Sequence, residues 1–136
     1  MGIEFYGTSS QPAAIVIRSS ASVSGIEFFT PVNYSQQIGL MSRPSGYTVP
    51  AHIHNEVERT ISTTQEVLMI RSGVCLISLL NASGHTFQKI TLEPGDVILL
   101  ATGAHKLQML TDCQILEVKQ GPYAGENDKC VVQDKS

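Results

Sequence analysis

Short runs of apolar or alternating residues recur along this chain at close intervals. They are rich in Val, Ile, Leu, Thr and Phe, and turn residues such as Gly, Pro, Asn and Asp separate them, a pattern typical of short β-strands. No window of 11 or more residues carries an apolar repeat of 3.6 residues, so long helices are not predicted. The pattern predicts an all-β sandwich or barrel. The expected strands cover residues 15–18, 25–30, 36–42, 67–71, 74–80, 86–92, 97–100, 106–110 and 114–119.

Two segments depart from this pattern. Residues 55–64 are polar and lie between two expected strands, which leaves a loop and an extra edge strand as alternatives. Residues 121–136 have turn chemistry and little periodicity, so we expect an irregular tail that wraps over the barrel or is partly disordered.

Length and composition agree with one small domain spanning residues 1–136. Of the 136 residues, 42% are apolar and 15% are charged, enough to fill a single core and too few charges for a disordered chain. The net charge is −3 and no Lys/Arg cluster occurs. A nucleic-acid partner is therefore not expected.

Three features predict a cytoplasmic location. The N-terminus lacks the basic and apolar regions of a signal peptide, and no apolar stretch is long enough to span a bilayer, so no membrane association is expected. Cys75, Cys113 and Cys130 are odd in number and widely spaced, which suits free thiols in a reducing compartment.

Three of the four histidines fall in two tight contexts. His52 and His54 are two residues apart, so on a strand both imidazoles would point to the same face. His105 follows a Pro-Gly turn, an apolar strand and a second, small-residue turn. Between these contexts, Glu66 precedes another apolar strand that ends at Gly73.

These residues stand in two ordered motifs that resemble those of the cupin superfamily. Gly46, five residues and His52-x-His54, followed later by Glu66, six residues and Gly73, resemble the first motif. Gly95, five residues, a small residue, one more and Gly103, with His105 after it, resemble the second, so the resemblance covers residues 46–110. It implies a double-stranded β-helix, or jelly-roll barrel, and one divalent metal ion held by His52, His54, Glu66 and His105.

The chain departs from the family pattern at two places. The family has three or four residues between His-x-His and its glutamate; here eleven residues separate His54 from Glu66, and Glu58 stands at the usual spacing. We expect Glu66 to be the ligand because Gly73 follows it at the family distance, with Glu58 as the alternative. In the second motif Ala101 replaces the usual proline and one residue is missing before His105.

Imidazoles and one carboxylate suit Fe, Mn, Ni, Co or Zn, and an octahedral ion would keep about two positions open. We therefore expect a metal-dependent enzyme that acts on a small molecule, either an oxygenase or an isomerase of a sugar or keto acid. The alternative is a non-catalytic module that binds a small ligand, with a structural metal or none.

Further expectations concern the surroundings of the site. Glu58, Arg59 and Tyr47 are candidates for substrate binding by their place in the sequence. Leu68 and Ile70 share the parity of Glu66 and are expected to form an apolar wall beside it. A homodimer is also expected, since small jelly rolls must protect their sheet edges, and residues 2–30 are the candidate for strand exchange.

Overall fold

The structure is a computed structural model that describes residues 2–136, and it is all-β. Every strand pair is antiparallel, and the only helix in the described residues is the short 3₁₀ turn η1 (Gly125–Asn127). The ten strands are β1 (Ile3–Gly7), β2 (Pro12–Ile17), β3 (Gly25–Phe28), β4 (Gly39–Ser42), β5 (Glu66–Ser72), β6 (Cys75–Leu80), β7 (Thr86–Leu92), β8 (Val97–Leu100), β9 (Ala104–Met109) and β10 (Gln114–Lys119).

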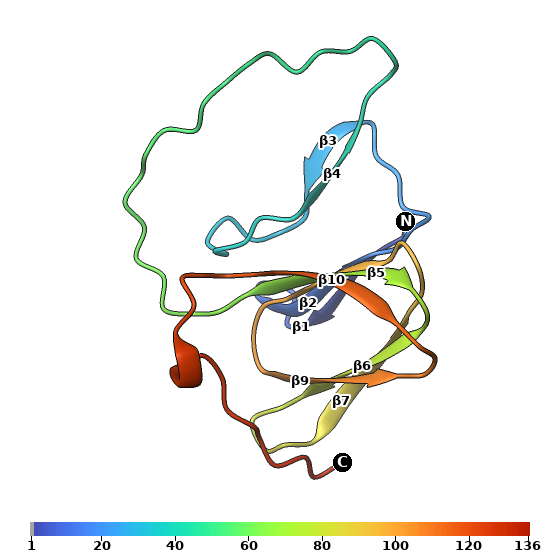
Figure 1. The fold of residues 1–136 in the computed structure, drawn as a ribbon, viewed down its shortest axis with the longest axis vertical. Helices are drawn as coiled ribbons and strands as arrows, with labels where there is room; N and C mark the ends of the chain where they lie inside the picture. Colours follow the sequence, from blue (N-terminus) through green and yellow to red (C-terminus); the bar gives the residue numbers. More distant parts are fainter. Residues whose placement is uncertain (1) are drawn as a thin grey trace.

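The strands form three layers (Figure 1). The middle layer is a five-stranded sheet in the order β1-β2-β8-β5-β10, and a three-stranded sheet in the order β7-β6-β9 lies on one side of it. The β3–β4 hairpin lies on the other side. The nine expected strands are all present, whereas β1 was not expected from the sequence.

The inner core fills the space between the five-stranded and three-stranded sheets. Leu68 and Ile70 of β5 point into it, as their shared parity with Glu66 predicted. Ile77 of β6 and Ile98 of β8 meet them there, and each of these four side chains is almost completely buried. This core fixes β5 and β9 on facing sheets.

A second apolar cluster covers the opposite face of the five-stranded sheet. Tyr34 and Ile38, which lie in the loop between β3 and β4, pack there against Ile15 and Leu99. The Tyr34 hydroxyl donates to the backbone oxygen of Pro12 at 2.5 Å. The connecting loop of the β3–β4 hairpin is therefore held on the outer face of the five-stranded sheet, away from the inner core.

The two main sheets do not close into a barrel. β9 pairs only with β6, and β10 pairs only with β5, so each presents one unpaired edge. The predicted closed barrel is therefore not formed by residues 2–136, and the jelly-roll topology stays a prediction. The physical reason is that residues 43–64, which carry His52 and His54, contain no strand and extend away from both sheets (Figure 1).

The tail, residues 121–136, contains no strand and runs past one end of the three-stranded sheet. Two ion pairs attach it to the strands: Lys119 with Asp128 at 2.8 Å and Lys106 with Asp134 at 2.5 Å. The Lys135 amide also donates to the backbone oxygen of Gly84. This path makes the tail one wall of the cavity described next.

Candidate functional site

Glu66 and His105 meet at the open end of the space between the two sheets. Glu66 is the first residue of β5 and His105 the second of β9, and the Glu66 Oε1 atom lies 2.8 Å from His105 Nε2. The Glu66 side chain is 15% exposed and that of His105 is 32% exposed. The pair is thus partly shielded by protein while still open to solvent on one side.

A second carboxyl group, Glu117 of β10, joins this pair. Glu117 is opposite Leu68 in the β5–β10 register, and Lys119 is opposite Glu66, so both side chains share the inward face of β5. The hydrogen bond with His105 lowers the pKa of Glu66 to about 2, against the opposing effect of burial. Hydrogen bonding to Glu66 raises the pKa of Glu117, and burial and the Glu66 charge act in the same direction.

Because the pKa of Glu66 is lowered and that of Glu117 is raised, the two carboxyl groups differ in how readily they hold a proton. Glu66 remains ionised beside the imidazole, and Glu117 holds a proton more readily than an ordinary glutamate does. One centre therefore contains an anionic acceptor, an imidazole and a carboxyl group that can donate.

The three groups line a cavity of about 830 Å³. Leu68 and Leu107 provide apolar surface in its wall, and Lys129 of the tail is a cation there that forms no ion pair with residues 2–136. The complete lining is Thr64, Glu66, Leu68, Leu80, Gly103, Ala104, His105, Lys106, Leu107, Glu117, Lys119, Asp128, Lys129, Cys130, Val131, Val132 and Asp134. Its size and mixed lining suit a small, partly polar molecule.

The structure does not bring His52 and His54 to this cavity. Both are exposed on the extended segment, with ring centroids 5.3 Å apart, and His52 Nδ1 lies 2.8 Å from the backbone oxygen of Pro50. Within residues 2–136 no three His, Cys, Asp or Glu side chains are grouped so that they could hold a metal ion. Of the four predicted ligands, a single chain therefore brings together only Glu66 and His105.

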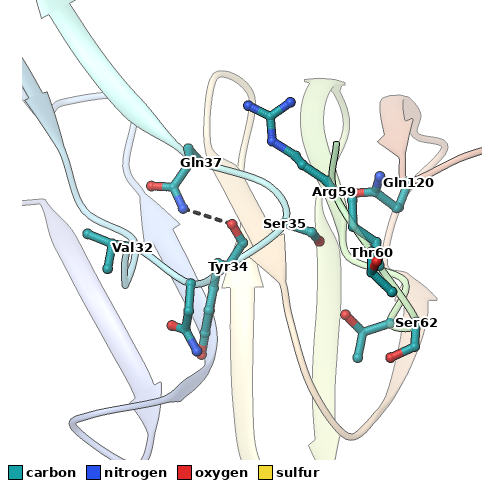
Figure 2. A pocket seen from close by; sticks show the side chains of 11 residues that line it. Val32, Tyr34, Ser35, Gln37, Arg59, Thr60, Ser62 and Gln120 are labelled. Atoms are coloured by element: carbon teal, nitrogen blue, oxygen red, sulfur yellow. Dashed lines mark hydrogen bonds between the residues drawn. The ribbon is translucent and has the colours of Figure 1, made fainter. Parts of the chain in front are cut away.

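The predicted substrate-binding residues also lie outside the cavity. Glu58 is exposed on the extended segment, and Tyr47 is half-exposed with the Arg43 guanidinium 4.6 Å from its ring centre. Arg59 lies at a second cavity of about 830 Å³, between the end of this segment and the loop that carries Tyr34 (Figure 2).

Glu117 and the tail residues were not expected at the site. The alternation in residues 114–119 could have placed Glu117 on the inward face together with Ile115, but the pairing of β10 with β5 was not visible in the sequence. The tail carried no signal of its own, because its position depends on long-range ion pairs.

Comparison with protein-family models, curated proteins and solved structures found no match to this chain. Among the described residues no helix is long and apolar enough to cross a membrane.

Proposed function

We propose that this chain is an enzyme that binds a small molecule in the Glu66–His105 cavity and moves a proton on it, as isomerases of sugars and keto acids do. The observation that carries the proposal is the 2.8 Å contact between Glu66 and His105 in the wall of an open cavity. The two residues come from two separate sequence motifs, and they meet across two different sheets.

The roles follow from the chemistry of the three groups. An ionised carboxylate bonded to one ring nitrogen fixes the tautomer and orientation of an imidazole and stabilises the imidazolium that forms when the ring takes up a proton. His105, fixed in this way by Glu66, acts as the base through its remaining nitrogen. Glu117, whose pKa is raised, acts as the acid that returns a proton to the substrate.

The lining indicates the class of substrate. Lys129 provides a positive charge for a carboxylate or another anionic group, while Leu68 and Leu107 offer an apolar wall. A keto acid or an acidic sugar has an anionic group for the lysine, carbon-bound surface for the apolar wall, and a carbon-bound proton next to a carbonyl.

Metal binding remains a prediction from the two motifs. Four ligands require His52 and His54 in the cavity, and the described residues of one chain do not place them there. No step of the proposed proton transfer passes through a metal ion. The cupin resemblance and the oxygenase alternative keep the status of predictions.

The test is solvent deuterium exchange, followed by NMR, in a panel of aldoses, ketoses and 2-keto acids. We expect one class to exchange the proton next to its carbonyl, with His105→Gln lowering the rate by about 10²–10⁴-fold and Glu66→Gln lowering it less. His85→Gln is the matched control, because His85 is exposed and outside the cavity lining. Full activity of His105→Gln, or neither exchange nor binding across the panel, would refute the proposal.

A further inference from the structure

The second cavity, where Arg59 lies, is built from parts of the chain that are far apart in the sequence. One wall is the loop between β3 and β4, with Ser35 and Gln37, and the facing wall is residues 59–63 at the end of the extended segment (Figure 2). Gln120, directly after β10, completes the lining. The volume of about 830 Å³ is in the range of small-molecule sites.

Hydrogen bonds hold the loop wall of this cavity in place. The Gln37 side-chain amide donates to the Tyr34 backbone oxygen at 2.8 Å. Gln36 donates from its backbone amide to the Gln65 side chain at 3.0 Å, and from its side-chain amide to Gln120 Oε1 at 3.1 Å. Because Gln65 is buried in the sheet, these bonds fix the wall, and a ligand that binds there has little loop ordering to oppose it.

Several polar groups of the lining have no partner among the described residues. The Ser35 hydroxyl oxygen is buried and makes no hydrogen bond within residues 2–136. A buried hydroxyl of this kind is destabilising unless it finds a partner, so it favours a ligand that supplies one. On the facing wall Arg59, Thr60 and Ser62 also make no side-chain hydrogen bond or ion pair in the part of the chain described. Figure 2 shows Ser35 directed from the loop toward this wall.

The chemistry of the lining defines the class of ligand. Within residues 2–136 Arg59 is the only charged side chain that lines the cavity, and no Asp or Glu reaches it. The guanidinium carries five N–H donors in a fixed fork, which can hold a phosphate or a carboxylate through two bonds at once. Most of the other lining side chains end in a hydroxyl or an amide, and these groups both donate to and accept from the hydroxyl groups of a sugar.

The second cavity is separate from the Glu66–His105 cavity. It lies on the outer face of the five-stranded sheet, and the two linings share no residue. The neighbours Lys119 and Gln120 illustrate the arrangement, because Lys119 lines the Glu66–His105 cavity and Gln120 lines the second one. A molecule in the second cavity therefore does not occupy the place of the substrate in the proposed reaction.

We propose that the second cavity binds a small polyhydroxylated molecule with one anionic group, either a sugar phosphate or a sugar acid. Arg59 holds the anionic group. The Ser35 hydroxyl and the Gln120 side-chain amide bond to the hydroxyl groups of the sugar. This site is independent of the reaction proposed above, because neither Glu66 nor His105 contributes to it.

The test is an NMR titration of the ¹⁵N-labelled full chain with glucose 6-phosphate, glucuronate and glucose. We expect the amide signals of Ser35, Gln37 and Gln120 to shift with at least one anionic sugar, and uncharged glucose to bind at least about tenfold more weakly. The stronger of the two anions identifies the phosphate or the carboxylate as the preferred group. Arg59→Gln should weaken binding about 10–100-fold. Arg71→Gln is the matched control, because Arg71 is exposed and lines neither cavity, and its affinity should equal that of the wild type.

Ser35→Ala tests the buried hydroxyl. The variant should bind the anionic sugar about 3–10-fold more weakly, because one hydrogen bond to the ligand is lost. It should not lower the melting temperature, since the hydroxyl has no partner within residues 2–136. Unchanged affinity would overturn the role given to this side chain.

Four results would overturn the proposal. They are no shift of the lining amides with either anionic sugar at about 10 mM, shifts confined to the lining of the Glu66–His105 cavity, equal affinity for glucose, and unchanged affinity in Arg59→Gln. His105→Gln should bind the anionic sugar in the second cavity as the wild type does. Failure of the deuterium-exchange test would therefore leave this site standing, and failure of the titration would leave the proposed reaction standing.

Discussion

Replacing Asp96 with alanine should destabilise this protein more than any single change at its surface. Asp96 is 3% exposed and follows the Pro-Gly turn that leads into β8. Its Oδ1 atom accepts from the Ser19 amide at 2.8 Å, and its Oδ2 atom accepts from the Glu93 amide at 2.9 Å. Arg18 Nη1 also donates to Oδ2 at 3.1 Å. The carboxylate thus joins the end of β2 to the start of β8.

The expected cost can be worked out from these bonds. Alanine leaves two backbone N–H groups without their acceptor, and each loss of this kind costs about 1–1.5 kcal/mol. Arg18 retains Glu4 and the Thr91 backbone oxygen as partners, so its contribution is small. We expect the free energy of unfolding to fall by about 3 kcal/mol for Asp96→Ala and by about 1.5 kcal/mol for Asp96→Asn, which keeps one oxygen acceptor.

Urea unfolding followed by circular dichroism measures this difference. With a slope of about 1.5 kcal/mol per molar urea, the Asp96→Ala midpoint should fall by about 2 M. Asp112→Ala is the matched control, because Asp112 is exposed and its side chain makes no hydrogen bond or ion pair among residues 2–136; its change should stay within about 0.5 kcal/mol. An Asp96→Ala midpoint within about 0.3 M of the wild-type value, which is about the error of such a midpoint, would refute this reasoning.

Three further predictions concern backbone conformation, pH and thiol chemistry. Gly73→Ala should lower the free energy of unfolding by at least about 3 kcal/mol in urea, because φ is +83° and an added Cβ would lie 2.0 Å from a backbone oxygen. Gly46→Ala, also at positive φ but with no atom within 4 Å of the added Cβ, should lower it by about 1 kcal/mol, and equal losses would contradict this reasoning. The hydrogen bond from the Arg18 guanidinium lowers the pKa of Glu4, so the stabilisation that this pair gives the fold is present above pH 4.5 and is lost as the pH falls through the lowered pKa. The melting temperatures of wild type and Glu4→Gln should therefore converge between pH 6 and pH 3, and a constant difference between them would contradict this prediction. Exposed Cys130 should react with a thiol reagent in the native state, while Cys75, which is buried and whose pKa is raised by that burial, should react only on unfolding; equal native rates of the two thiols would contradict the burial of Cys75 in the core.

Local pattern was enough to predict most of the strands. The bounds of β7, β8 and β10 agree with the residues expected, because alternation and turn residues define both ends of each. β1 was missed because its Ile-Glu-Phe-Tyr-Gly run is short, lies beside the N-terminus and lacks a regular apolar alternation. The local sequence pattern could not predict whether the sheets close into a barrel, since that depends on which strands pair over long sequence distances.

The candidate site was predicted in part for the same reason. Glu66 and His105 are held by strands whose own sequences predict them, and the two residues meet in the structure. His52 and His54 were predicted to lie on a strand, and a strand needs a partner edge, which residues 43–64 do not have among the described residues 2–136. Glu117 lies at the site because β10 pairs with β5, and no local feature of the sequence predicts that pairing.

The strand order of the five-stranded sheet also determines when each strand can pair with its neighbours during synthesis on the ribosome. β8 is inserted between β2 and β5, so neither of these apolar strands has its central neighbour until about residue 100 has been synthesised. Before that point only local hairpins such as β1–β2 and β6–β7 can pair, and β10 arrives later still. The nascent chain therefore leaves one edge of β2, and from about residue 72 also β5, without the neighbouring β8 until residue 100, and pairing between such distant segments slows folding.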